Sequence, residues 1–212
     1  MCKSAVILGN GAFPRKAYPR YILSCADYLV CCDGAIRHLD RLGIVPDAIV
    51  GDLDSIPRSL RRKYSGIVQH CPDQETNDLT KAFRFLREHC QDADFIHILG
   101  ATGLREDHTL ANISLLTEYA KELDGSSQSI DMVSDFSTMI PLTASSSLEV
   151  GKGRKVSIFT ADQSLKIKSA GLEWPTDSVV LDNWWKASLN RACEDSITLT
   201  FSHPSTAIVI LD

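Results

Sequence analysis

The sequence has little of what a membrane or nucleic-acid partner would require. No stretch approaches the ~20 apolar residues of a spanning helix, and the apolar run near the N-terminus is too short for a signal peptide. Basic residues are in deficit, with 22 Lys and Arg against 27 Asp and Glu, whereas polyanion binding requires clustered positive charge. The one basic run, residues 58–63, is predicted to be a solvated helix face. We therefore expect a cytoplasmic protein with no membrane and no nucleic acid among its partners.

The cysteines lack the pattern of a disulfide framework. There are seven, an odd number without regular spacing, and several lie inside apolar runs. We expect reduced thiols that pack in the core as small hydrophobic side chains: Cys2, Cys25, Cys31, Cys32, Cys71, Cys90 and Cys193. The length of 212 residues, 44% of them hydrophobic, is that of a globular protein with one large or two small domains.

Short apolar runs alternate with helical patterns in the first half of the chain. Six runs predict strands, at 5–9, 28–32, 48–52, 67–71, 95–99 and 130–133. They are nearly continuous in apolar residues, which is typical of parallel strands buried on both faces. Apolar stripes over residues 79–90 and 110–120 predict two helices, with Thr76 or Asn77 capping the first. We predict a Rossmann-like α/β domain over residues 1–134.

Short alternating segments replace the helical periodicity after about residue 134. Six segments predict strands, at 147–150, 155–160, 164–169, 178–182, 196–201 and 206–211. Residues 141–147 are small and polar, and they predict a loop. Such a pattern is typical of a small sandwich. We therefore predict a C-terminal antiparallel β-sandwich over residues 135–212.

Two carboxylates follow the third predicted strand. If residues 48–54 are extended, Asp52 and Asp54 point to the same side of the chain. A cation would relieve their mutual repulsion. Mg²⁺ is the first candidate because it takes oxygen ligands from carboxylates, phosphates and water. Taken alone, the motif is equally compatible with a solvated Asp52 and with Asp54 or Ser55 as the cap of a turn.

Other polar residues also follow predicted strands, and parallel strands bring their carboxyl ends to one edge of a sheet, where ligands bind. Asn10 follows the first strand, and Asp33 and Gly34 follow the second. Asp78 and Lys81 begin a predicted helix. They form either an ion pair on its surface or part of a site, in which Asp78 binds a metal and Lys81 neutralises the charge of a transferring phosphate. Their joint occurrence favours a ligand site more than any one residue does.

The segment ILGATGLREDH, residues 98–108, lies between the fifth predicted strand and the next helix. Its glycines can present N–H groups to an anion. Arg105 can grip a phosphate through two hydrogen bonds, and Asp107 adds a third carboxylate for a metal. Considered singly, each glycine is better explained as a turn residue and Asp107 as a helix cap.

Together these segments resemble the thiamin pyrophosphokinases. The similar pieces are CCDGAIRHLDRLGIVPDAIVGDLDSI (31–56), DQETNDLTKAF (73–83), GATGLREDHTLANISLL (100–116) and, more loosely, GLEWP (171–175) and SLNRA (188–192). The resemblance implies an α/β domain followed by a β-sandwich, and a homodimer with thiamin near the subunit interface. It also implies transfer of a diphosphoryl group from ATP to the hydroxyl of thiamin with Mg²⁺, giving thiamin diphosphate and AMP.

The resemblance assigns roles to individual residues. An acidic cluster around Mg²⁺ and the phosphates would comprise Asp52, Asp54, Asp78 and Asp107. The residues along ATP would be Asp33, Gly34, Thr102 and Arg105, with Lys81 near the phosphates. Asp54 or Asp78 would accept the proton of the thiamin hydroxyl. One departure is Leu104, which stands where the family has a second glycine before the arginine.

Thiamin carries a permanent thiazolium cation, which suits an aromatic face. All three tryptophans lie in the second half of the chain. We expect Trp174 in the sandwich core or a dimer interface, whereas the Trp184–Trp185 pair, at positions where the family has smaller residues, is as compatible with a pocket as with a core. The resemblance places Ser188 and Asn190 in the region that contacts thiamin. The predicted acceptor pocket therefore includes Trp185, Ser188 and Asn190.

Three other functions are compatible with parts of the pattern. A phosphatase of the haloacid-dehalogenase type also uses D-x-D, but there the motif ends the first strand, and here two predicted strands precede it. A Mn²⁺-dependent glycosyltransferase fits poorly with the sandwich and the short chain. A nucleotide or thiamin sensor would have to bind ATP beside four carboxylates, which hinder binding unless a metal is recruited.

Overall fold

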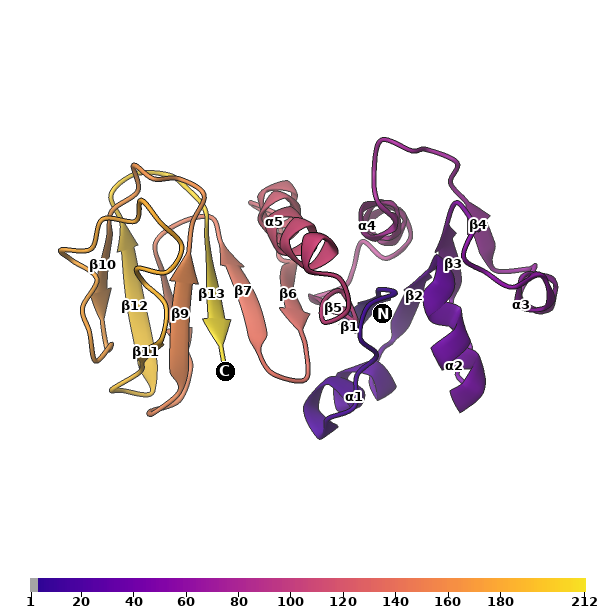
Figure 1. Ribbon diagram of the computed structural model, residues 1–212, viewed down its shortest axis with the longest axis horizontal. Helices are drawn as coiled ribbons and strands as arrows, with labels where there is room; N and C mark the ends of the chain where they lie inside the picture. The colour runs from indigo at the N-terminus through magenta and orange to yellow at the C-terminus, as the bar shows by residue number, and fades with distance from the viewer. Residues whose placement is uncertain (1–3) are drawn as a thin grey trace. The chain divides into compact units, whose positions relative to one another are not determined.

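The computed structural model describes residues 4–212, which divide into two compact units (Figure 1). Unit 1 extends to residue 115 and includes residues 125–135, and unit 2 comprises residues 116–124 and 136–212. The prediction for Cys2 lies outside the described residues. Across residues 4–212, every helix is too short or too polar to span a membrane.

Unit 1 is built on a parallel sheet. Its strands are β1 (Ser4–Leu8), β2 (Tyr28–Cys32), β3 (Ala48–Gly51), β4 (Val68–His70), β5 (Phe95–Leu99) and β6 (Ser129–Val133). They lie in the order β6-β5-β1-β2-β3-β4, all parallel. Each strand overlaps one of the six predicted apolar runs. From β1 the chain adds β2, β3 and β4 on one side of the sheet and then β5 and β6 on the other. The predicted Rossmann-like α/β fold is confirmed.

Helices cover both faces of this sheet. They are α1 (Ala17–Ser24), α2 (Ile36–Leu42), α3 (Arg58–Lys63), α4 (Asp78–His89) and α5 (Glu106–Glu122), with a 3₁₀ turn at Asp33–Ala35. Side chains of α1 and α2 join one core cluster with β1, β2 and β3, and α4 lies on the opposite face (Figure 1). The predicted solvated face at α3 is confirmed because none of its residues is buried.

The two predicted helical stripes have different outcomes. The stripe of α4 is buried, from Leu79 to Cys90, and Asn77 caps the helix by accepting the N–H of Thr80 at 2.9 Å. The stripe of α5 is wrong at its start, because Leu110 is 52% exposed. Burial in α5 begins further along the helix.

Unit 2 is antiparallel. Its strands are β7 (Thr138–Leu142), β8 (Ser146–Glu149), β9 (Lys155–Phe159), β10 (Ile167–Ala170), β11 (Asn190–Arg191), β12 (Ser196–Phe201) and β13 (Ala207–Leu211). Four of these strands follow one another in the order β11-β9-β13-β7, and the other three form a separate sheet in the order β10-β12-β8. Apolar side chains such as Val156, Ile197 and Val209 are completely buried in the shared core. The second antiparallel sheet fits the predicted β-sandwich.

Several details of unit 2 differ from the prediction. Residues 178–182 form a loop rather than a strand, and its apolar Leu181 is buried in the core instead of pairing with a neighbour. The predicted loop at 141–147 instead holds the end of β7 and the start of β8. Trp174 is 54% exposed, so of its two expected positions the sandwich core is wrong, and the dimer interface stays a prediction.

The cysteines also divide between the two outcomes. Cys31, Cys32 and Cys90 are buried, as predicted, and Cys71 is half-buried. Cys25 and Cys193 are exposed, so the prediction of a core position is wrong for these two. All six described cysteines are free thiols.

Candidate active site

The turn after β3 carries the D-x-D motif. The strand ends at Gly51, so the predicted extended conformation through Asp54 is wrong. Leu53 has a φ of 69°, in the left-handed region that costs a non-glycine residue about 1–2 kcal/mol. Its side chain is only 5% exposed, and burial of a leucine contributes about 1.5–3 kcal/mol, which offsets the strain. In this conformation the Asp54 N–H donates to Asp52 Oδ1 at 3.2 Å.

Three carboxylates converge above this turn. Carboxylate oxygens of Asp33, Asp52 and Asp54 all lie within 4.8 Å of one another. Asp33 follows β2 and is 1% exposed; its Oδ2 accepts the N–H of Ser55 at 3.1 Å, whereas its Oδ1 is buried with no hydrogen-bond partner among the described residues. A buried anionic oxygen without a donor is unfavourable. A cation bound between these hard oxygen ligands would satisfy it, so the residues fit a divalent metal.

The electrostatics of the cluster agree with this interpretation. The pKa of Asp33 is raised to about 6. Burial is the main cause, the charges of Asp78, Asp54 and Asp52 add to it, and the hydrogen bond from the Ser55 N–H acts in the opposite direction. The pKa of Asp52 is lowered by the Asp54 N–H and then by the side-chain amide of Gln74, whose Nε2 lies 3.3 Å from Asp52 Oδ2. A cation would lower the free energy of the ionised cluster.

Asp78 adjoins the same cluster across Gly51. A Cβ placed on Gly51 would lie 2.8 Å from Cβ of Asp33 and 3.3 Å from Oδ1 of Asp78, so the absence of a side chain there allows both carboxylates to approach β3. Lys81 is 7% exposed, and its Nζ lies 3.2 Å from Asp78 Oδ1. The pair at the start of α4 thus places one cation beside the acidic residues.

Two glycine-containing loops meet beside the cluster. The Asn10 side chain lies against Gly34, where an added Cβ would be only 2.5 Å from Asn10 Nδ2. The N–H of Gly11 donates to the carbonyl of Gly100 at 2.6 Å, and the loop after β1 also donates to the carbonyl of Thr102 at 2.8 Å. The structure therefore brings the predicted residues Asn10 and Gly34 together and ties Thr102 to their loop.

Arg105 and Asp107 form an ion pair with each other. Arg105 donates from Nε to Asp107 Oδ1 at 3.1 Å and from Nη2 to Oδ2 at 2.5 Å. This pairing lowers the pKa of Asp107 to about 2. Asp107 lies outside the group formed by Asp33, Asp52 and Asp54. Its predicted role as a metal ligand stays a prediction.

Of three residues that support these loops, Ser55 was expected only as a possible turn cap, and Arg37 and Asn112 were not expected at all. Arg37 donates to the carbonyl of Ser55, and the Ser55 hydroxyl donates to Asp54 at 2.9 Å. Asn112 donates to the carbonyl of Ala101 at 2.7 Å. Arg37 and Asn112 lie in segments that carry the family resemblance, which is the one signal that could have singled them out.

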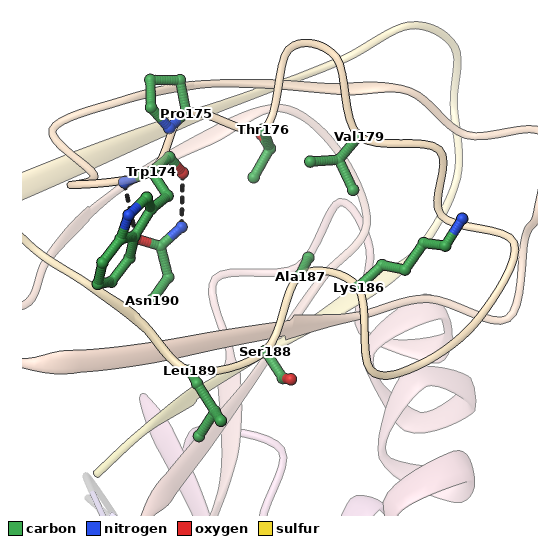
Figure 2. Close-up of a pocket in the computed structure, with 9 residues that line it drawn as sticks. All are labelled: Trp174, Pro175, Thr176, Val179, Lys186, Ala187, Ser188, Leu189 and Asn190. Carbon is green, nitrogen blue, oxygen red and sulfur yellow. Dashed lines mark hydrogen bonds between the residues drawn. The ribbon is translucent and has the colours of Figure 1, made fainter.

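Unit 2 contains a cavity of about 250 Å³. Figure 2 shows it between the segment from Trp174 to Val179 and the segment from Lys186 to Asn190. Its volume approaches the ~300 Å³ at the lower end of small-molecule sites. The exposed ring of Trp174 contributes to its wall, and Trp185, which is 69% exposed, is not among the lining residues.

Two predicted pocket residues line this cavity, but their polar atoms are engaged. Asn190 is 6% exposed, and its amide donates to the Trp174 carbonyl at 2.6 Å and accepts the Trp174 N–H at 3.2 Å (Figure 2). The Ser188 hydroxyl donates to the carbonyl of Trp185 at 2.6 Å. Asn190 therefore fixes the position of Trp174, a residue expected in the core or a dimer interface and not in the predicted pocket.

Comparison with known proteins assigns both halves of the chain. Residues 19–124 match the family model described as thiamin pyrophosphokinase, catalytic domain, and residues 137–207 match thiamin pyrophosphokinase, substrate-binding domain. The chain belongs to the thiamin pyrophosphokinase family. The resemblance read from the sequence is confirmed.

Curated relatives and solved structures in the thiamin pyrophosphokinase family agree with this assignment. Thiamine pyrophosphokinase 1 of Oryza sativa subsp. japonica is 29% identical over an alignment 220 residues long. The alignment covers 90% of this chain and 80% of the rice protein. Thiamin pyrophosphokinase 1 of Caenorhabditis elegans is 33% identical over 128 residues, 56% of this chain and about half (51%) of the nematode protein. The thiamine pyrophosphokinase structure from Bacillus subtilis, at 21% identity, has a TM-score of 0.78 over 99% of both chains.

Membership in the thiamin pyrophosphokinase family also ranks the candidate functions. It supports ATP-dependent diphosphorylation of thiamin, a transferase reaction, and it does not favour the phosphatase or the sensor. The two family models fall on the parallel-sheet half and the antiparallel half of the chain. The acidic cluster lies in the former, and the cavity lies in the latter.

Proposed function

We propose that this chain is an enzyme that transfers a diphosphoryl group from ATP to the hydroxyl of thiamin, giving thiamin diphosphate and AMP. The observation that carries the proposal is the convergence of Asp33, Asp52 and Asp54, with one buried oxygen unpartnered, at the carboxyl edge of the parallel sheet in a chain of this family. Such an edge is where α/β proteins bind phosphorylated ligands.

The acidic residues fit a Mg²⁺ site. Asp52 and Asp54 would hold the ion together with Asp33, a carboxylate oxygen of which lies in the same group, and Asp78 adjoins them across Gly51. When bound, Mg²⁺ would neutralise charge on the phosphates of ATP and align them. Asp107 is proposed to belong to the acidic cluster around Mg²⁺ and the phosphates of ATP, where its partner Arg105 also lies.

The other polar residues bind and orient the nucleotide. Asn10, Gly34 and Thr102 would lie along ATP, because their loops meet at the strand ends beside the cluster. Lys81 would neutralise phosphate charge from the start of α4. Arg105 would bind phosphate through the two donors that now contact Asp107.

The transfer itself requires alignment and one proton acceptor. The hydroxyl oxygen of thiamin attacks the β-phosphorus, the bond from that phosphorus to the oxygen bridging the α-phosphate breaks, and AMP leaves with that oxygen. Asp54 or Asp78 takes the hydroxyl proton. Arg105 and Lys81 stabilise the negative charge on the phosphates and on departing AMP.

The proposed acceptor pocket is the cavity of unit 2. Trp174 presents an aromatic face that suits the thiazolium cation, and Val179 and Ala187 add apolar walls. Ser188 and Asn190 shape the pocket through their bonds to the tryptophan segments. Trp185, exposed beside Ser188, is proposed to border the pocket.

Two further properties belong to this proposal. We propose a homodimer, as the family resemblance implies, in which the exposed Trp185 of unit 2 approaches the subunit interface. We also propose a cytoplasmic location, which is supported by the free thiols of all six described cysteines.

An AMP-release assay tests the function. Purified protein is incubated with ATP, Mg²⁺ and thiamin, beside a control without thiamin, and the products are separated by chromatography. We expect AMP and thiamin diphosphate in equal amounts, and only when thiamin is present. ADP or phosphate released without thiamin would indicate a hydrolase, and ligand binding without any turnover would indicate a sensor.

A further inference from the structure

We propose that Leu53 is a positioning residue, whose buried side chain sets the spacing of the Asp52 and Asp54 carboxylates and thereby the affinity for a metal-bound nucleotide. The inference rests on the proposed function, since it assumes that these carboxylates hold the cation of Mg·ATP.

The conformation of Leu53 is unusual for its residue type. Among residues 4–212, Leu53 and Leu189 are the two non-glycine residues with positive φ, at 69° and 60°. Leu189 is 81% exposed, whereas Leu53 is 5% exposed and belongs to the core cluster that includes Ile56 and Tyr64. Leucine gains nothing locally from a left-handed backbone, so tertiary packing of the side chain holds Leu53 there.

The hydrogen bonds of the turn depend on that conformation. The Asp54 N–H reaches Asp52 Oδ1 at 3.2 Å, and the Ser55 N–H reaches Asp33 Oδ2 at 3.1 Å. Asp54 is exposed, so water competes for its polar contacts. Water cannot replace the apolar contacts of the buried Leu53 side chain. These contacts therefore stabilise the conformation of the turn more than its solvent-exposed hydrogen bonds do.

The third carboxylate shows why this spacing matters. The backbone of Asp33 belongs to another segment, the 3₁₀ turn after β2, where its side chain lies against Gly51; the N–H of Ser55 links it to the D-x-D turn. A carboxylate oxygen of Asp33 lies within 4.8 Å of oxygens of Asp52 and Asp54, and the buried Oδ1 of Asp33 has no hydrogen-bond partner among the described residues. If the turn relaxed, Asp52 and Asp54 would move relative to Asp33, whose backbone lies in a different segment of the chain.

The test separates the φ angle from burial by three substitutions. Leu53→Gly accepts positive φ and removes the buried side chain, Leu53→Asn tolerates the same φ but is polar, and Leu53→Met keeps an apolar side chain of similar volume. The matched control is Ile22→Ala, because Ile22 is 6% exposed in the same core cluster but lies on α1.

Calorimetry measures the binding of the Mg²⁺ complex of α,β-methylene-ATP, a non-cleavable ATP analogue, at a temperature where all variants are folded. Circular dichroism gives the Tm of each variant. We expect Leu53→Gly and Leu53→Asn to bind the complex about tenfold or more weakly, and Leu53→Met within about threefold of wild type, since a displacement near 1 Å can cost about a hundredfold. Ile22→Ala should lower Tm and leave the affinity unchanged.

Each outcome decides a different point. Wild-type affinity in Leu53→Gly overturns the positioning role, and so does an equal loss of affinity in Ile22→Ala, which would reflect general destabilisation. Partial rescue by Leu53→Met together with weak binding by Leu53→Asn supports it. A wild-type protein that does not bind the complex refutes the proposed function, and the positioning role with it.

Discussion

The side-chain amide of Asn77 donates a 3.1 Å hydrogen bond to that of Asn112. Asn77 also accepts the N–H of Thr80 and so caps α4, while Asn112 donates to the carbonyl of Ala101. The two amides connect the first turn of α4, which carries Lys81, with the loop after β5. Both connected segments are proposed to bind phosphate.

Replacement of Asn112 should therefore loosen the nucleotide site. Asn112→Ala removes two hydrogen bonds, each worth about 1 kcal/mol, so we expect the KM for ATP to rise about tenfold with a smaller change in kcat. Steady-state kinetics with varied ATP measure the effect. Leu110→Ala, at an exposed position of the same helix, is the control. An unchanged KM for ATP in Asn112→Ala would contradict the bridging role.

The charge of Asp52 is expected to be essential for turnover. Asp52→Asn keeps the shape of the side chain but removes one negative charge from the proposed metal site, and we expect kcat to fall about a thousandfold or more. The AMP-release assay measures the loss. Glu118→Gln, which removes an exposed carboxylate paired with Lys121 at 2.8 Å, should leave kcat unchanged. Substantial turnover by Asp52→Asn would argue for a different metal site.

Trp174 is expected to determine the affinity for thiamin. Trp174→Ala removes the aromatic wall of the cavity, and loss of a cation–π contact should raise the KM for thiamin about tenfold without raising the KM for ATP. Trp174→Phe should be affected less. Trp184→Ala is the matched control, because Trp184 is equally exposed, at 55%, but does not line the cavity. If Trp184→Ala has the larger effect, the acceptor pocket lies elsewhere.

Asp162 is expected to stabilise the sandwich in a pH-dependent way. Its carboxylate accepts hydrogen bonds from Ser164, His203 and Ser205 at 2.6–2.9 Å, which hold the pKa of Asp162 well below its usual range. A depressed pKa contributes stability above the unfolded-state value of about 3.9, and that stability is lost as the pH falls toward the folded-state pKa.

Tm measured against pH tests this contribution. Asp162→Asn should unfold at lower temperature than wild type at pH 7, and the difference should shrink as the pH falls below about 4. A difference in Tm that stays constant down to pH 2 would show that the carboxylate charge is not its source.

Much of the architecture follows from patterns that burial imposes on the sequence. The continuous apolar runs became parallel strands because both faces of that sheet are covered, and the buried stripe of α4 followed the same logic. Asp33 and Asp52 could be expected near each other because parallel strands bring their carboxyl ends to one edge. The position of Asp107 outside this group could not be predicted, because it depends on the loop in which Asp107 pairs with Arg105.

The failures have identifiable physical causes. Helix α1 was not predicted because Pro19 ordinarily ends a helix, yet here it lies in the first turn, where no backbone donor is lost. Residues 178–182 are apolar because Leu181 fills the core from a loop. The left-handed Leu53 contradicts the local preference of leucine, so only the tertiary structure could place it.

Gly51 limits how this sequence can change. Any side chain at that position would displace Asp33 or Asp78 from β3, and its neighbours cannot compensate, because both clashing groups belong to the acidic cluster itself. Position 51 can be randomised in a library and selected in a host whose growth depends on this enzyme to convert thiamin into thiamin diphosphate. We expect the selection to return glycine alone. If the cavity of unit 2 is the acceptor pocket, as proposed above, new acceptors are more accessible through substitutions there, where the walls consist of side chains such as Val179 and Ala187.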